Sequence, residues 1–160
     1  MTHDDDLDTI RTLLRAARTA TVTTRTASGA LHSRPLALLE GDFDGTLWFF
    51  TADPSPKTED LRVHPEVNVA VGSDKGYLSL SGTGRVDRDP ARIDELWNPW
   101  AEAYFENGRQ DPAVALLRVD VETAELWDTE KPLIVKAFEI GRAIMTKTPP
   151  DVGDSTTLRI

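Results

Sequence analysis

The fold of this chain is decided by residues 19–51, which read TATVTTRTASGALHSRPLALLEGDFDGTLWFFT. The Thr/Val run at 19–25 favours an extended strand, because β-branched side chains pack well on a pleated surface. A second strand is expected at 31–40, and the sequence Asp42-Phe43-Asp44-Gly45 is typical of a hairpin turn into a third. That third strand, at 46–51, is apolar at most positions, which predicts burial on both of its faces.

Later in the chain, further strands are expected at 67–71, 77–87, 116–121 and 124–127. Gly82 and Gly84 predict a β-bulge or the corner of a closed sheet. Short strands joined by tight turns favour an antiparallel sheet, and the glycine breaks favour its closure toward a barrel. The sequence shows no βαβ alternation and no Gly-rich phosphate loop, which counts against a Rossmann domain.

Helices are expected where apolar residues recur every three or four positions, at 7–17, 56–62, 90–105 and 133–145. Ser55 is expected to cap the second of these, with Pro56 at its first position. Pro99 lies inside the third and should kink or break it. Residues 1–145 are expected to form one domain, and 146–160 a flexible tail.

Composition excludes several classes of protein. Lys and Arg number 18 against 27 Asp and Glu, and the net charge of −9 argues against nucleic acids and anionic membranes as partners. The absence of cysteine removes disulfides, thiolate metal sites and cysteine nucleophiles. No apolar run approaches the roughly 18 residues of a membrane span, and the acidic start is unlike a signal peptide. We therefore expect a cytoplasmic protein.

The sequence offers no clear metal site and no catalytic residue. His3, His32 and His64 are isolated, and none has the spacing of a metal ligand set. No Gly-x-Ser-x-Gly nucleophile motif occurs. Acidic pairs such as Glu59 and Asp60 are interpreted as solvated surface, as is usual in an acidic chain.

One stretch does indicate binding chemistry. Arg34 precedes Pro35 in mid-strand, and a proline there predicts an edge strand, a bulge or an open ladder. Lys57 follows Thr51 by six residues and lies on the first turn of the helix capped by Ser55. If the strands at 31–40 and 46–51 are hairpin neighbours, two cations, a hydroxyl and free helix N–H groups converge. Such a set predicts a phosphate site.

Several segments, taken in order and spacing, carry a resemblance that covers about residues 7–145. They are Thr19–Arg25, Leu31–Pro35, Leu47–Thr51, Ser55-x-Lys57, Leu61–Val69, Tyr77–Gly82, Leu96–Pro99 and Ala124–Asp128. Together they resemble the general stress protein 26 group of the pyridoxamine 5′-phosphate oxidase-like, FMN-binding split-barrel superfamily. The resemblance implies a mainly β fold with flanking helices, built on a six-stranded antiparallel split β-barrel. It also implies a homodimer with two FMN clefts between the subunits.

The resemblance assigns roles to individual residues. Arg34 and Lys57, helped by Ser55, resemble the ligands of the FMN phosphate. Backbone at Pro35 and Leu36 resembles the segment along the isoalloxazine edge. The strand end that passes the ribityl chain and ring corresponds to Phe50 and Thr51, and Trp97 of the partner chain corresponds to a cleft wall. FAD or a deazaflavin remains an alternative to FMN.

Two functions therefore stand about equally: a small flavin-dependent oxidoreductase of unknown substrate, and a flavin-binding or reservoir protein without turnover. Two further functions rank below them: a haem-binding split barrel, and a structural barrel with an empty cleft. True pyridoxamine phosphate oxidases carry a C-terminal segment with Arg and His that grips the vitamin, whereas this chain has no histidine after His64. Vitamin B6 oxidation is therefore not expected. The aromatic stripe at 97–105 is expected at a subunit interface.

Overall fold

The computed structural model describes residues 3–128 and 155–159. Their elements follow in the order α1 (His3–Ala16), β1 (Thr19–Arg25), β2 (Leu31–Ala37), β3 (Thr46–Ala52), α2 (Pro56–Val63), β4 (Glu66–Ser73), β5 (Gly76–Asp87), α3 (Pro90–Leu96), α4 (Pro99–Tyr104), β6 (Val114–Asp128) and β7 (Ser155–Arg159). Within these residues, the helices are all too short or too polar to span a membrane.

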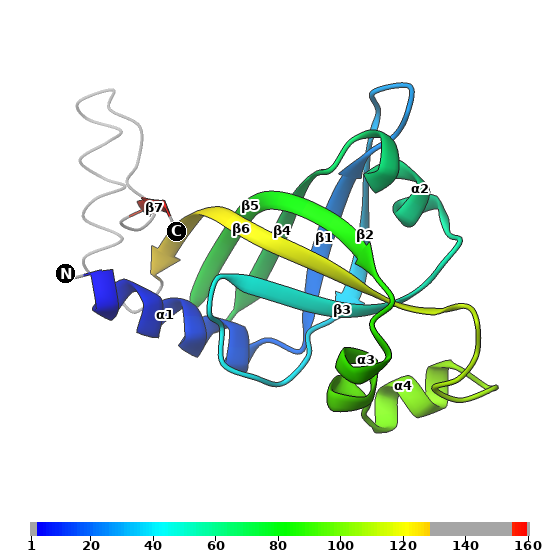
Figure 1. Ribbon diagram of the computed structural model, residues 1–160. Coiled ribbons are helices and arrows are strands. Elements are labelled where there is room, and N and C mark those ends of the chain that lie inside the picture. The colour runs from blue at the N-terminus through cyan, green and yellow to red at the C-terminus, as the bar shows by residue number, and fades with distance from the viewer. Residues whose placement is uncertain (1–2, 129–154, 160) are drawn as a thin grey trace, which may run out of the picture.

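A single antiparallel sheet dominates the structure, with strand order β2-β1-β4-β5-β6-β3. The sheet curls until its two edges, β2 and β3, approach each other without pairing. Helix α1 runs along one end of the curled sheet, α2 lies beside the β1–β2 end, and α3 and α4 lie below β3 (Figure 1). The predicted mainly β fold, a six-stranded antiparallel split barrel with flanking helices, is confirmed.

Two apolar clusters pack the helices against the sheet. Phe49 and Leu80 are fully buried in the first, where Ile10 of α1 joins the strands. The second cluster lies between β3 and the two short helices and contains Phe50 and Phe105. Alternate residues of β3 thus enter different clusters, which confirms its predicted burial on both faces.

The predicted bulge lies between Ser81 and Gly82 of β5, where the register with β6 shifts. Ser81 faces Thr123 and Gly82 faces Val121, so Glu122 is the extra residue of β6. A Cβ atom at Gly82 would overlap the backbone oxygen of Asp120, so only glycine allows this approach. The sequence predicted two strands here, at 116–121 and 124–127, but the bulge lets β6 continue as one strand.

The predicted hairpin at 42–45 is wrong. β2 pairs with β1 and β3 pairs with β6, so the strands on either side of this motif are opposite edges of the sheet. Phe43 is buried, and its carbonyl accepts a hydrogen bond from Arg11 Nε at 3.0 Å. Gly45, with φ of 108°, offers its carbonyl to the Val121 N–H at 2.9 Å. The motif therefore lies in the loop that connects the two edge strands β2 and β3, and its hydrogen bonds attach that loop to α1 and β6.

Of the predicted helices, the one at 90–105 is found as two shorter helices, and the one at 133–145 is not tested. The stripe at 90–105 breaks at Pro99 into α3 and α4, and Asn98 caps α4 by accepting from the Ala101 N–H at 2.9 Å. The helix predicted at 133–145 lies outside the described residues. The last part of the predicted flexible tail forms β7, which pairs with residues 123–127 of β6. β3 pairs only with residues 114–120 of β6, so β7 lies beyond the end of that pairing. The two consecutive threonines in this segment favour a strand because they are β-branched.

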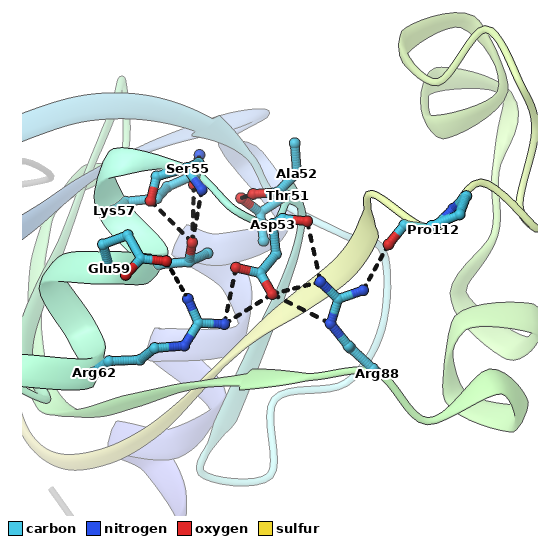
Figure 2. A network of polar contacts seen from close by, with 10 residues as sticks. Thr51, Ala52, Asp53, Ser55, Lys57, Glu59, Arg62, Arg88 and Pro112 are labelled. Carbon is cyan, nitrogen blue, oxygen red and sulfur yellow. Dashed lines mark hydrogen bonds and ion pairs between the residues drawn. The ribbon is translucent and has the colours of Figure 1, made fainter.

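A buried carboxylate fastens the end of β3 (Figure 2). Asp53 is 3% exposed, and both of its oxygens accept from Arg62 Nη2 of α2, at 2.9 and 2.8 Å. Arg88, after β5, donates from Nη2 to Asp53 Oδ2 at 2.6 Å and from Nη1 to the Pro112 carbonyl at 2.7 Å. The network therefore joins β3, α2, the β5–α3 connection and the segment before β6.

These contacts keep Asp53 ionised. Hydrogen bonds from Arg62 hold the pKa of Asp53 well below its usual range, with further support from Thr58 and Arg88. Burial acts in the opposite direction and is outweighed. The same pairing raises the pKa of Arg62.

Replacing Asp53 by Asn should lower the free energy of unfolding by about 2 kcal/mol near neutral pH, because two guanidinium groups lose their shared counter-charge. A fully buried pair would lose more, but Arg62 and Arg88 are 46% and 47% exposed. Since the pKa of Asp53 is lowered by folding, its stabilisation is complete above about pH 5. It begins to decline near about pH 4 and is lost as the pH falls toward the lowered pKa of the folded state. Urea unfolding of both proteins across this range tests the prediction, and a pH-independent difference would contradict it.

Candidate functional site

The start of α2 forms one half of the candidate site. Ser55 has an extended backbone (φ −153°) and is the N-cap, and Pro56 occupies the first turn, as predicted. The Ser55 N–H donates to Thr58 Oγ1 at 2.9 Å. Lys57 Nζ donates to Ser55 Oγ at 3.3 Å. Because Asp53 is fixed two residues earlier, the Ser55 hydroxyl and the Lys57 ammonium have a rigid support.

Arg34 of β2 forms the other half. Its Nη1 donates to Thr24 Oγ1 of β1 at 2.7 Å and to the Val22 carbonyl at 3.4 Å. Its Nη2 lies 3.8 Å from Asp60 Oδ2 of α2. The guanidinium group is therefore held between a strand and the helix that carries Lys57.

The two cations influence each other electrostatically. Burial lowers the pKa of Lys57, and the nearby positive charge of Arg34 lowers it further. Burial also lowers the pKa of Arg34, while the negative charge of Asp60 raises it. Asp60 therefore offsets Arg34, while Lys57 places a second positive charge beside the Ser55 hydroxyl. Such a donor set fits an anionic group with several acceptor oxygens.

The structure therefore brings Arg34, Ser55 and Lys57 together, although by a different route from the expected hairpin. β2 and β3 do not pair, so the end of β3 does not place Arg34. Instead, α2 packs over β1, and Thr24 Oγ1 donates to Asp60 Oδ2 at 2.9 Å. The curled sheet and α2 together bring Arg34 close to Ser55 and Lys57, which was the role expected of the hairpin.

Pro35 and Leu36 follow Arg34 along β2, opposite Thr21 and Ala20 of β1. β2 is an edge strand, so of the three alternatives predicted for Pro35 (an edge strand, a bulge or an open ladder) the edge strand is the one observed. Pro35 is exposed, whereas the Leu36 side chain packs against the first cluster. The outer side of β2, which no other described strand pairs with, therefore offers its backbone to a ligand.

Contacts within the subunit fix the positions of Phe50, Thr51 and Trp97. Phe50 is 3% exposed and packs edge-on against Trp97, with ring centroids 5.5 Å apart. The indole Nε1 of Trp97 donates to Glu102 at 2.6 Å, so its own subunit orients the ring. Thr51 is buried and donates to the Ala52 carbonyl at 3.2 Å. The Phe50 side chain and Trp97 belong to the second cluster, whereas Arg34 lies on β2 and Lys57 on α2.

Two residues of the site were missed from the sequence. Asp60 was interpreted as solvated, but its side chain is only 12% exposed and faces Arg34. Thr24 received no role, although it is 1% exposed and contacts both charged groups. A usable signal existed for Asp60, because it follows Lys57 by three residues and therefore shares its helix face.

Comparison with known proteins gives a consistent family. The family model described as "Pyridoxamine 5′-phosphate oxidase like" matches residues 5–151. Among curated proteins, protein bli-3 of Neurospora crassa is 27% identical over 161 residues, which cover 93% of this chain and 77% of that protein.

Solved structures share the fold. The general stress FMN/FAD binding protein of Xanthomonas citri is 34% identical with a TM-score of 0.70, covering 82% of this chain and 94% of that one. A Clostridium acetobutylicum protein related to general stress protein 26 has a TM-score of 0.75 at 19% identity, covering 99% and 97% of the two chains. The resemblance to the general stress protein 26 group is confirmed, and the chain belongs to the pyridoxamine 5′-phosphate oxidase-like family.

Proposed function

We propose that this protein binds the phosphate of FMN with Arg34, Lys57 and Ser55 and acts as a small flavin-dependent oxidoreductase. The observation that carries the proposal is the convergence of two partly buried cations on one helix start. A phosphate monoester presents three terminal oxygens, so it can accept hydrogen bonds from both cations and from the Ser55 hydroxyl at once.

The relatives support a flavin as the ligand. The Xanthomonas citri protein, 34% identical to this chain, is named an FMN/FAD binding protein. A bound flavin would supply hydride and electron transfer, which leaves binding and orientation to the protein. This division of roles agrees with the lack of a catalytic motif in the sequence.

The two sheet edges suit the remainder of the flavin. β2 and β3 approach each other without pairing, so both carry backbone groups that the described strands leave unpaired. In the proposed complex, backbone at Pro35 and Leu36 follows the edge of the ring system. Because the side chains of Phe50 and Thr51 are buried, their backbone is the part that borders the ribityl chain.

We also propose a homodimer with the flavin clefts at its interface. Trp100 and Tyr104 of α4 stack with centroids 5.1 Å apart, yet they are 43% and 57% exposed. Exposed aromatic pairs of this kind are typical of interface cores. In that dimer, the partner subunit's Trp97 would form a wall of the cleft, as the resemblance implies. A cytoplasmic location stays a prediction from the sequence.

The oxidoreductase proposal predicts that the purified protein is yellow and that NADH or NADPH reduces its flavin without oxygen. Bleaching of the visible flavin absorption under anaerobic conditions measures this reduction. A flavin that binds but is reduced by neither nucleotide would contradict turnover with these donors and favour the flavin-binding protein. A Soret band without flavin would contradict flavin binding altogether.

The phosphate site predicts that Arg34→Ala and Lys57→Ala each weaken FMN binding by roughly 10- to 100-fold, as expected for the loss of one charge-assisted hydrogen bond. Titration of the apoprotein followed by flavin fluorescence measures the affinity. Lys75→Ala and Arg85→Ala serve as matched controls, because they remove cations from β5 and the turn before it. Unchanged affinity in the Arg34 and Lys57 variants would refute the site.

The dimer predicts a sedimenting mass near twice 17.7 kDa at micromolar concentration. The double variant Trp100→Glu with Tyr104→Glu should sediment as a monomer, because it places charge in an apolar interface. It should also lose FMN, since the cleft would need both subunits. A monomeric wild-type protein, or a monomeric variant that binds FMN normally, would contradict the proposed clefts.

A further inference from the structure

A hydrogen-bonded relay joins Arg34 to α2 through a single buried hydroxyl. Arg34 Nη1 lies 2.7 Å from Thr24 Oγ1, and Thr24 Oγ1 lies 2.9 Å from Asp60 Oδ2. A guanidinium group can only donate and an ionised carboxylate can only accept. The Thr24 proton must therefore point to Asp60, which leaves the oxygen lone pairs for Arg34. The direction of both hydrogen bonds is fixed by the chemistry of the three groups.

The relay is protected from water, which makes it a rigid support. Thr24 is 1% exposed, and the side chains of Asp60 and Arg34 are 12% and 22% exposed. Thr24 belongs to β1, Arg34 to β2 and Asp60 to α2, so three elements meet at one hydroxyl. Because Asp60 follows Lys57 by one helical turn, the relay also sets Lys57 relative to Arg34.

The relay determines which face of the guanidinium group remains for a ligand. Nη1 has two hydrogens, and they point to Thr24 Oγ1 and to the Val22 carbonyl, the latter at 3.4 Å. Nη2 lies 3.8 Å from Asp60 Oδ2, which is an ion pair beyond hydrogen-bond distance. The N–H groups of Nε and Nη2 therefore form the remaining fork, which matches two oxygens of a phosphate. Thr24 thus engages one end of the guanidinium group and leaves the other end for the anion.

We propose that Thr24 and Asp60 are positioning residues that hold Arg34 for the phosphate and so make the site prefer FMN to riboflavin. This inference rests on the proposed function, because it needs the phosphate at Arg34. Neither residue is a ligand of the flavin. Riboflavin lacks the phosphate, so a defect confined to Arg34 should weaken FMN and leave riboflavin unchanged.

The test measures the affinities of FMN and riboflavin for the full-length apoprotein by fluorescence titration. Thr24→Val keeps the shape of the side chain and removes its hydroxyl, and we expect it to weaken FMN about tenfold without weakening riboflavin. Thr24→Ser keeps the hydroxyl and should retain the wild-type preference. Thr23→Val is the matched control, because that hydroxyl lies 2.7 Å from Ser33 Oγ and outside the relay. If Thr24→Val does not fold, Thr24→Ala removes the same hydroxyl without an added methyl group.

A double-mutant cycle shows whether Thr24 acts through Arg34. In the Arg34→Ala background, Thr24→Val should have no further effect on FMN affinity. Equal weakening of FMN and riboflavin, or a Thr24→Ser variant as defective as Thr24→Val, would overturn the positioning role. The Arg34→Ala variant separates the two hypotheses. If it binds FMN normally, the proposed phosphate site fails; if it is defective while Thr24→Val is normal, only the relay fails.

Discussion

Two positive charges held together in a partly buried position are the constraint on which the site depends. Arg34 and Lys57 repel each other, and burial removes part of the water that would screen them. Asp60 offsets one of the two charges, and Thr24 fixes the geometry in which it does so. A bound phosphate group would offset the remaining charge. In the proposed complex, a site arranged in this way would discriminate ligands by charge before any contact with a ring system is made.

The fold supplies what this arrangement needs. Lys57 lies on the helix between β3 and β4, whereas Arg34 lies on an edge strand, and only the curl of the sheet brings α2 over β1. Asp53 fixes the end of β3 and thereby the start of α2 (Figure 2). The bulge at Gly82 lets the long β6 follow this curvature. The core of the barrel and the polar networks around α2 therefore support the same small region of the surface.

The local features of the site could be predicted from the sequence, and the long-range ones could not. Ser55 as a helix cap and Pro35 on an edge strand follow from backbone rules that need only neighbouring residues. The pairing of the strands around 42–45 was predicted wrongly, because turn composition does not encode which edge of a curled sheet a strand joins. Thr24 and Asp60 were missed because their roles depend on partners 10 and 36 residues away. The family resemblance suggested residues for the proposed site without showing what orients them.

A crystal structure of the wild-type protein soaked with FMN tests the central claim most directly. The account predicts phosphate oxygens within about 3 Å of Lys57 Nζ and of Arg34, with Arg34 Nη1 still on Thr24. A flavin whose phosphate lies elsewhere, or an Arg34 side chain that has left Thr24 to reach it, would contradict the account.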